Sequence, residues 1–363
     1  MTHCFDVDRT DLSNSRWAEV PRPSHEEGMV ELEIEGFAFT ANNITYAVAG
    51  DMLDYWGFFP AEQPWGRIPC MGYGRVVDSA VDGVAVGSRY YGWYPMAERV
   101  FITATPSSGG FRDDGEHRTN HAPVYRTFER LDPDSGDADG DGLTERGHRR
   151  LLLRGLFATS WLVDDFLASN DDFGAERVII TSASSKTSIA LAHSVFARGD
   201  GRPTTVGLTS PRNRAFVESL GWYDEVVEYG ELDGDWPIDR DTPSVIVDMA
   251  GDQPLLATLH GGLGDLRHSA RVGMTHWDSM DAVELPAPAP EFFFAPSQIQ
   301  VRAAEWGAEE LNSRLLDAVN RFIDDSFDWM TVEVAEGRDA VADLYDRTRN
   351  GEVSPATGQI GVV

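Results

Sequence analysis

The chain has 363 residues, enough for two domains with substantial cores, and its hydrophobic content of 42% is typical of a soluble globular protein. Sixty acidic residues against 30 lysines and arginines give a formal net charge of −30, which argues against nonspecific binding to nucleic acid and against anionic membranes. Two cysteines exclude a disulfide framework, and neither a signal-like N-terminus nor an apolar run of 18 residues is present, so we expect a cytoplasmic protein with a halophilic, acidic composition.

Residues 1–105 have the pattern of short strands. Met29–Glu35 alternates apolar and acidic residues, which is typical of a half-buried strand. Glycines and aromatic residues recur in Met71–Asp78 and Val84–Tyr94, as they do in small barrels with tight corners. We therefore predict a β-rich domain over residues 1–150.

Residues 106–149 differ from the rest of that domain and predict a loop-rich insertion with one short helix around Val124–Arg130. His117 and His121 are closely spaced, but the chain offers too few further ligands for zinc, so we expect a solvated pair. In the acidic run Asp132–Gly142, the residues Asp137, Asp139 and Asp141 followed by Gly142 imitate the first half of a calcium loop. Its twelfth position is His148 and not a bidentate Glu, so we predict a solvated loop and no metal.

From Leu151 onward the pattern alternates between helices and short apolar strands. This alternation indicates an α/β fold with a doubly wound parallel sheet, a Rossmann domain, over residues 151–285. Residues 286–363 are expected to supply its last strand and helix and then return to the first domain. The predicted strands are Arg177–Thr181, Thr204–Leu208, Glu225–Tyr229, Ser244–Met249, Ala270–Met274, Glu291–Phe294 and Trp329–Val334, and the predicted helices are Leu151–Ser169, one from Lys186, Arg212–Leu220 and Ala308–Asp324.

The only lysine of the chain, Lys186, lies in a turn between a predicted strand and a predicted helix. Such a turn directs backbone N–H groups and the positive end of the helix dipole to one point, which favours a bound phosphate, and a lysine adds a point charge. Small hydroxyl residues replace the usual glycines and can donate to phosphate oxygens. The turn therefore predicts a pyrophosphate site; the alternative is a lysine that lies on a helix surface by chance. The predicted residues are Ser182, Ser184, Ser185, Lys186 and Thr187.

Other lysine chemistries can be tested by spacing. A P-loop needs glycines at the positions of Ile180 and Ser185, and a Ser-x-x-Lys nucleophile needs serine at the position of Ala183. Neither pattern is present. A pyridoxal-phosphate Schiff base on Lys186 remains a distant alternative.

The end of the second strand of this domain distinguishes between the two nicotinamide cofactors. An NAD site usually has an acidic residue there for the ribose hydroxyls, whereas an NADP site has cations and hydroxyls for the 2′-phosphate. No acid follows Leu208, which favours NADP(H). The alternative is a Ser-Pro helix start with solvated arginines. The candidate residues are Thr209, Ser210, Arg212, Asn213 and Arg214.

These segments resemble the medium-chain dehydrogenase/reductase superfamily, in particular its zinc-free quinone-oxidoreductase-like members. Met71–Val77 looks like the Gly-x-Gly-x-Val segment of that superfamily, and Gly174–Ile180 looks like its first Rossmann strand. Glu218–Tyr229, Val245–Gly251 and Ala270–Thr275 resemble later strands and turns. The resemblance implies a GroES-like N-terminal domain, NADP(H) as the cofactor, and cofactor contacts from Tyr229, Gly251 and Gly273.

The resemblance also implies the catalytic residues. Zinc-dependent members have a cysteine where this chain has Ala41 and Asn42, and a lone Cys70 cannot complete that site, so no metal is implied. Zinc-free relatives often carry Asn-Pro-x-Asp where this chain reads Asn43-Ile-Thr-Tyr46. Tyr46 would hydrogen-bond the substrate carbonyl or act as the acid, and Asn43 would position substrate or nicotinamide. The alternatives are a core aromatic for Tyr46 and a turn residue for Asn43.

The resulting hypothesis is an NADPH-dependent reductase of a quinone, enone or enoyl-type small molecule, with a homodimer left open. A protein of another class, an NADP(H)-binding sensor or partner without turnover, would show the same degenerate turn. The insertion 106–149 is expected to cover the cleft or form a subunit contact. The aromatic run Tyr55–Phe59, with Trp65, lines a pocket for a flat substrate or belongs to the core.

Overall fold

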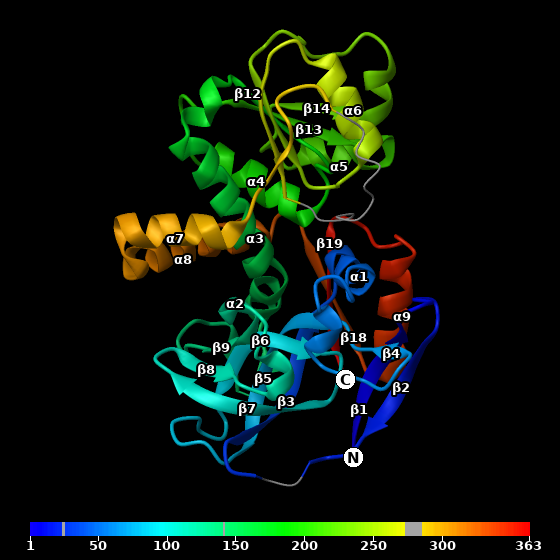
Figure 1. Cartoon of the computed structure of the whole chain (residues 1–363), viewed down its shortest axis with the longest axis vertical. Helices are drawn as coiled ribbons and strands as arrows, with labels where there is room; N and C mark the ends of the chain where they lie inside the picture. Colours follow the sequence, from blue (N-terminus) through cyan, green and yellow to red (C-terminus); the bar gives the residue numbers. More distant parts are fainter. Residues whose placement is uncertain (24–25, 141, 273–284) are drawn as a thin grey trace. The chain divides into compact units, whose positions relative to one another are not determined.

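The structure, a computed structural model, describes residues 1–23, 26–140, 142–272 and 285–363 (Figure 1). Contacts divide the chain into two compact units. Unit 1 comprises Met1–Leu152 together with Met330–Val363, and unit 2 comprises Leu153–Trp329. The helix α3 (Glu145–Ser169) carries the chain from unit 1 into unit 2.

Unit 1 contains an eight-stranded sheet in the order β18-β19-β3-β5-β6-β9-β8-β7. An additional antiparallel pairing of β3 with β7 closes the strands from β3 to β7 into a barrel, which leaves those strands without a free edge. The strands are β3 (Met29–Ala38), β5 (Pro69–Ser79), β6 (Arg89–Pro95), β7 (Arg99–Ser107), β8 (Gly110–Asp113), β9 (Thr127–Arg130), β18 (Thr331–Glu336) and β19 (Thr357–Val362).

Smaller elements complete unit 1. A three-stranded sheet has the order β2-β1-β4, and β10 pairs with β11 in a short hairpin. The alternating strand predicted at Met29–Glu35 is confirmed as part of β3, whose Leu32 and Ile34 side chains lie in the core. The elements are β1 (Thr2–Asp8), β2 (Ser15–Val20), β4 (Trp65–Gly66), β10 (Ala138–Asp139), β11 (Gly142–Leu143), α1 (Ala41–Val48), α2 (Pro123–Arg126), α9 (Arg338–Arg349), and the 3-10 helices η1 (Tyr55–Gly57) and η2 (Glu116–Arg118).

The insertion 106–149 contributes to the barrel more than its sequence predicts. The helix expected over Val124–Arg130 is wrong in its second half, because α2 ends at Arg126 and the chain continues as strand β9. Phe128 is fully buried and stacks on Phe111, with ring centroids 4.8 Å apart. Burial of this ring against β8 outweighs the local preference for a helix.

Unit 2 contains a six-stranded parallel sheet in the order β14-β13-β12-β15-β16-β17, which confirms the predicted parallel sheet. The chain order reverses beside β12, between β13 and β15, which is the point where ligands of such sheets usually bind. The strands are β12 (Arg177–Ile180), β13 (Thr204–Thr209), β14 (Glu225–Glu228), β15 (Ser244–Asp248), β16 (Leu266–Arg271) and β17 (Glu291–Phe292).

The helices of unit 2 include several that the sequence pattern missed. The helices α6 and α7 were not predicted, and the single helix expected over Arg212–Leu220 is split into η4 and α5. In Figure 1 α7 and α8 lie side by side. The helices are α4 (Lys186–Phe196), α5 (Arg214–Ser219), α6 (Gln253–Gly262), α7 (Ala295–Trp306), α8 (Ala308–Asp325), and the 3-10 helices η3 (Asp171–Gly174), η4 (Pro211–Asn213) and η5 (Tyr229–Asp233).

The strand predicted at Ala270–Met274 begins four residues earlier, at Leu266, and the end of the prediction lies outside the described residues. The sequence pattern missed the start of this strand because His268 and Ser269 are polar. In the structure His268 stacks on Phe173 with ring centroids 4.0 Å apart, and the Ser269 Oγ is 3.0 Å from the Nε2 of His260. Ser269 is therefore satisfied by a hydrogen bond, whereas His268 is held by ring stacking and its Nε2 has no hydrogen-bond partner among the described residues.

Gly207 in the middle of β13 has no room for a side chain. A Cβ there would lie 2.8 Å from Cδ1 of Tyr223 and 2.9 Å from the Cβ of Ala183. We therefore expect Gly207→Ala to lower the free energy of unfolding by about 1–3 kcal/mol through overpacking. Urea unfolding followed by circular dichroism measures this. Gly230→Ala is the control, because a Cβ at Gly230 meets nothing within 4 Å, and an equal effect of both substitutions would contradict the prediction.

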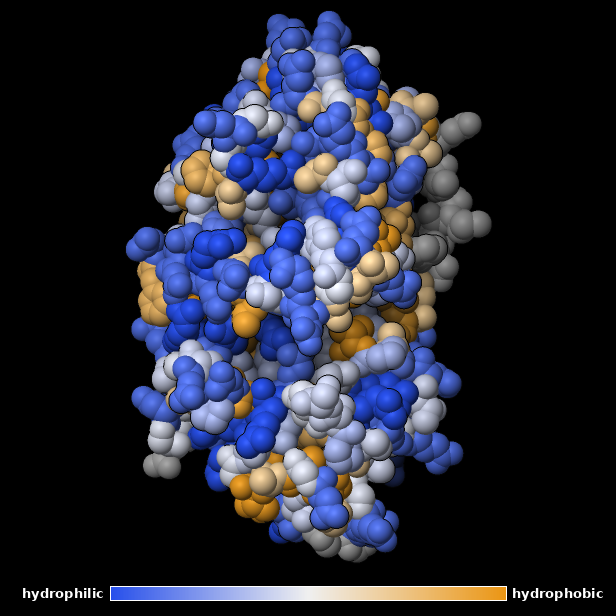
Figure 2. All heavy atoms as spheres, turned by 90° about the vertical axis from the view of Figure 1, so that its left-hand side faces the viewer, coloured by the Kyte–Doolittle hydropathy of each residue, from blue (hydrophilic) through white to orange (hydrophobic). Residues whose placement is uncertain are grey.

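The surface agrees with the acidic composition. Hydrophilic residues dominate the face drawn in Figure 2. A search of the described helices finds no segment with the length and apolarity needed to span a lipid bilayer.

Candidate functional site

The turn between β12 and α4 forms without glycine. Ser182 adopts a left-handed conformation with φ of 51°, which is uncommon for a residue with a side chain, and its N–H donates to the hydroxyl of Tyr229 over 3.2 Å. Ser185 caps α4, since its Oγ accepts from the N–H of Ser188. The turn thus brings the start of an 11-residue helix to the carboxyl edge of the sheet.

The hydroxyl groups of this turn are organised by hydrogen bonds. The Oγ of Ser185 donates to the Oγ of Ser188 (2.8 Å), which donates in turn to the carbonyl of Thr181 (2.8 Å). The Nδ2 of Asn213 donates to the Oγ of Ser184 over 2.9 Å. The bond between Asn213 and Ser184 joins two segments that the sequence proposed separately, the turn after β12 and the turn after β13.

Lys186 is the first residue of α4, and its side chain is partly buried. Burial lowers the pKa of Lys186 to about 8. Desolvation disfavours the charged ammonium, so an anion that binds nearby would stabilise it. The neighbouring Thr187 contributes its carbonyl to a 2.7 Å hydrogen bond from the Oγ of Ser160, which attaches the first turn of α4 to α3.

The residues after β13 fall into two groups. Thr209 is 1% exposed, and its Oγ1 has no hydrogen-bond partner in the described part of the chain. Ser210 precedes η4 without capping it, and Arg212 is exposed and forms no ion pair with any described residue. These residues retain hydrogen-bonding capacity and charge for a ligand.

Arg214 differs from Arg212 because its charge is already neutralised. Its guanidinium pairs with the carboxylates of Glu218 (2.9 Å), Glu231 (3.0 Å) and Glu228 (3.5 Å). A cation with three carboxylates around it has little attraction left for a phosphate. Of the two arginines that the sequence proposed for a 2′-phosphate, Arg212 is therefore the better candidate.

The structure adds Asp248, at the end of β15, which the sequence analysis did not propose. Its carboxylate is fully buried and accepts hydrogen bonds from the Oγ1 of Thr181 (2.9 Å) and from the N–H groups of Ala250 (3.0 Å) and Gly251 (3.1 Å). Burial raises the pKa of this carboxyl group. An acid at the end of an apolar strand was the available signal. Asp248 connects the turn after β15 to the turn after β12.

Three predicted cofactor contacts have different outcomes. Tyr229 lies beside the turn through its bond to Ser182, and burial raises the pKa of its hydroxyl. Gly251 has φ of 70°, a conformation that favours glycine, and it belongs to the Asp248 turn. Gly273 lies outside the described residues.

In unit 1 the amide of Asn43 is fully used by its surroundings. Its Oδ1 accepts from the N–H and the hydroxyl of Thr40 (2.8 and 3.2 Å), which forms a capping box at the start of α1. Its Nδ2 donates to the carbonyl of Pro69 (3.1 Å) and to the Sγ of Cys70 (3.5 Å). An amide offers four such positions, so Asn43 anchors α1 and has none left for a substrate.

Tyr46 lies on α1 in an aromatic cluster and is partly buried. Its hydroxyl oxygen accepts a 2.6 Å hydrogen bond from the Nδ2 of Asn42, and its ring lies 4.6 Å from that of Tyr55. Burial raises the pKa of Tyr46. The phenol therefore stays protonated at neutral pH and can donate a hydrogen bond.

The expectation of a solvated His117–His121 pair is wrong for His121. This side chain is buried, and its Nε2 lies 3.0 Å from the Oδ2 of Asp54 and 3.2 Å from the Asp54 carbonyl. His117 is exposed. Packing of η2 against the segment around η1 buries one histidine and leaves the other at the surface.

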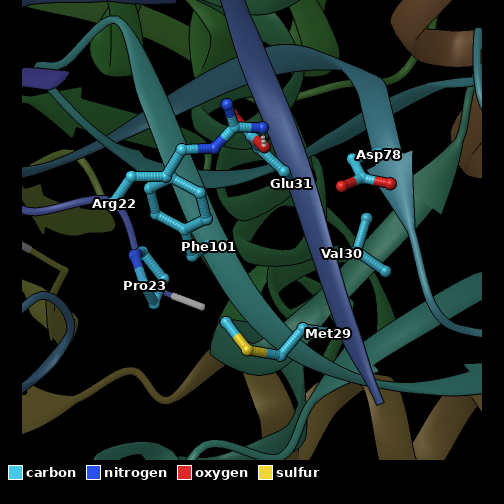
Figure 3. Close-up of a pocket in the computed structure, with 7 residues that line it drawn as sticks. All are labelled: Arg22, Pro23, Met29, Val30, Glu31, Asp78 and Phe101. Carbon is cyan, nitrogen blue, oxygen red and sulfur yellow. Dashed lines mark hydrogen bonds and ion pairs between the residues drawn. The ribbon is translucent and has the colours of Figure 1, made fainter. Parts of the chain in front are cut away.

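A cavity of about 110 Å³ lies on the barrel of unit 1 (Figure 3). Figure 3 shows Arg22 reaching the carboxylate of Glu31, which also pairs with Arg99 at 2.7 Å. Arg22 and Glu31, two charged residues that line the cavity, are therefore already paired. None of the predicted site residues lines this cavity. The lining residues are Arg22, Pro23, Met29, Val30, Glu31, Asp78 and Phe101.

Comparisons with known proteins support the fold. A family model described as a protein of unknown function (DUF2855) matches residues 37–354. Among curated proteins, none matches this sequence. Solved structures with a similar fold include the CurK enoyl reductase, with 13% identity, a TM-score of 0.57 and 99% of each chain covered.

Two further solved structures are of the same kind. Mycobacterial Rv1454c in complex with NADPH has 15% identity and a TM-score of 0.56, with all of both chains covered. A quinone oxidoreductase from Pseudomonas syringae pv. Tomato DC3000 has 14% identity and a TM-score of 0.56, with 99% of this chain and 100% of that chain covered. At this identity the likeness shows the fold alone.

Proposed function

This chain belongs to the DUF2855 family, and we propose that it is an NADP(H)-dependent oxidoreductase that reduces a quinone, enone or enoyl-type small molecule without zinc. The observation that carries this proposal is the edge of the parallel sheet beside β12. Lys186 begins the helix that follows β12, and Thr209, whose Oγ1 is unsatisfied, ends the neighbouring strand β13, so both lie at the carboxyl ends of paired strands. A helix start, a cation and a free hydroxyl are what a nucleotide phosphate requires.

Different residues of unit 2 would bind different parts of the nucleotide. Lys186 and the N–H groups at the start of α4 would hold the pyrophosphate, while Thr209, Ser210 and Arg212 would receive the phosphorylated ribose. Asp248 takes no part in direct contact, because its oxygens are occupied by Thr181 and by the turn at Gly251. It positions these two turns relative to each other. When bound, NADPH supplies the hydride.

The likeness to a structure that contains NADPH, and to quinone oxidoreductases and enoyl reductases, supports the same function. The absence of an acidic residue directly after β13 favours NADPH over NADH. The zinc-free mechanism rests on the sequence, which has Ala41 and Asn42 where zinc-dependent members have a cysteine.

Turnover is the direct test of this proposal. Purified protein in high salt, mixed with NADPH and a panel of quinones, enones and enoyl thioesters, should oxidise NADPH with at least one acceptor class. Loss of NADPH absorbance measures the reaction. Binding of NADPH without oxidation across the panel would instead favour a nucleotide sensor, and no binding at all would overturn the proposal.

Arg212 allows a test of cofactor choice. We expect Arg212→Ala to weaken NADPH binding by roughly 5- to 30-fold, the size of one solvent-accessible charge-assisted hydrogen bond, with NADH binding nearly unchanged. Arg202→Ala is the matched control, because Arg202 precedes β13 at its opposite end and pairs with Asp224. Equal losses for both nucleotides would exclude recognition of the 2′-phosphate by Arg212. Fluorescence titration measures both affinities.

A further inference from the structure

A closed group of aromatic rings surrounds Tyr46 in unit 1. The ring of Tyr46 lies 4.6 Å from Tyr55 and 5.5 Å from Trp93. Tyr125, which comes from the insertion, lies 5.7 Å from Trp93 and 6.4 Å from Tyr55. Phe58 contacts both Tyr55 and Tyr125, at 5.5 and 5.4 Å. The insertion thus supplies one side of a cluster whose other members come from α1, η1 and β6.

Tyr125 is held in place by the residues that precede it. The guanidinium of Arg118 is buried and lies 4.1 Å from the centre of the Phe58 ring, and it also donates to the carbonyl of Tyr125. The ring of His121 also packs on the Phe58 ring, with centroids 4.5 Å apart, and the Nε2 of His121 forms a hydrogen bond with Asp54. These contacts fix the insertion against the segment around η1, so the phenol of Tyr125 is preorganised.

The three tyrosine hydroxyls lie close enough to interact with one another. Tyr46 interacts electrostatically with Tyr125, and Tyr55 interacts with both. The hydroxyl of Tyr46 accepts from Asn42, so its own proton is still available. Tyr55 and Tyr125 share a side-chain hydrogen bond that raises the pKa of Tyr55, so the Tyr55 hydroxyl is its donor. This bond leaves Tyr46 and Tyr125 as the phenol donors of the cluster.

Apolar side chains that are neighbours of this cluster in the sequence are exposed. Val48 follows Tyr46 by two residues, Met52 and Leu53 lie just before the segment of Tyr55, and Val124 precedes Tyr125. All four are exposed, Val48 to 61% and Val124 to 57%.

We infer that Tyr125 and Tyr46 bind the carbonyl oxygen of a planar conjugated acceptor whose ring packs on the aromatic cluster, with Tyr55 donating to Tyr125. The inference rests on the proposed function, whose acceptor site it assigns. Phenol donors fit an oxygen on which negative charge develops during reduction. Burial raises the pKa values of Tyr46 and Tyr55, so these groups remain donors and do not become phenolates. The insertion therefore contributes a substrate-binding residue.

Equilibrium binding of 1,4-naphthoquinone to the full chain without nucleotide, followed by quenching of tryptophan fluorescence, tests this inference. Tyr125→Phe should weaken binding about 3- to 10-fold, the size of one neutral hydrogen bond. Naphthalene has the same fused ring without oxygen and should bind equally to both proteins. Tyr345→Phe is the matched control. The Tyr345 hydroxyl, on α9, donates to the carbonyl of Leu12, so its removal should leave the quinone affinity unchanged.

Two results would overturn the inference. One is a quinone affinity that Tyr125→Phe leaves unchanged, and the other is an equal loss of naphthalene and quinone binding, which would reveal a packing effect. Failure of the proposed function is distinguishable from both, because it would show as absent NADPH binding while quinone binding remains sensitive to Tyr125.

Discussion

Replacement of Asp248 by alanine is expected to lower the free energy of unfolding by about 3 kcal/mol or more. The substitution leaves the hydroxyl of Thr181 and the N–H groups of Ala250 and Gly251 without their acceptor in a buried site. Each unsatisfied buried donor costs about 1–3 kcal/mol, and water entry relieves part of that cost. Urea unfolding followed by circular dichroism measures the change, with NADPH binding recorded on the same samples.

Asp248→Asn is the matched control, because an asparagine Oδ1 still accepts from Thr181 and from the turn. We expect a loss of about 1 kcal/mol for this variant. Burial raises the pKa of the Asp248 carboxyl, so the folded state keeps its proton to higher pH than the unfolded chain does. The stability of the natural protein relative to Asp248→Asn should therefore fall as the pH rises above the usual carboxyl range. An alanine variant as stable as the asparagine variant would contradict the assigned hydrogen bonds.

Replacement of Lys186 by alanine is expected to weaken NADPH binding by about 5- to 150-fold, or about 1–3 kcal/mol. This is the range for one charge-assisted hydrogen bond to a phosphate. Lys186 is the only lysine, and it stands at the first position of α4, where the helix dipole adds to its charge. Fluorescence titration with NADPH at constant high salt measures the loss.

The pH dependence of the same titration separates charge from packing. Burial lowers the pKa of Lys186 to about 8, so the free protein carries the ammonium below that pH and loses it above. NADPH affinity should therefore fall as the pH rises from 7 to beyond 8. Lys186→Arg keeps its charge throughout and should show a flat profile. An alanine variant with unchanged affinity, or a natural protein without pH dependence, would exclude Lys186 from the phosphate site.

Local patterns predicted the central strands of unit 2 well because these strands are short and have apolar middles. Arg177–Ile180 and Ser244–Asp248 are buried on both faces, and a continuous apolar run bounded by turns is the expected form of a strand in a parallel sheet. The turn at Lys186 was also evident from the sequence, since a cap, a helix and a cation are adjacent in the chain. The start of β16 was missed because the polar His268 and Ser269 are stabilised by residues elsewhere in the chain.

Residues far apart in the chain explain most of what the sequence did not predict about the site. Arg214 was a phosphate candidate until its ion pairs with Glu228 and Glu231 were known. Asn43 matches the resemblance as a residue type, yet its amide is consumed by Thr40, Pro69 and Cys70. Availability for a ligand depends on which partners surround a group, and a linear pattern does not contain that information.

The sequence by itself determined the parallel sheet, the β-rich unit and the position of the lone ammonium at the start of a helix. These follow from hydrophobic periodicity and turn chemistry, which act over a few residues. Only the tertiary structure decided that Asp248 joins two turns, that Arg214 is neutralised, and that Tyr125 lies among the aromatic residues of α1 and η1. Such contacts depend on packing between segments that are not adjacent in the chain, where burial, charge and hydrogen bonding outweigh local preference.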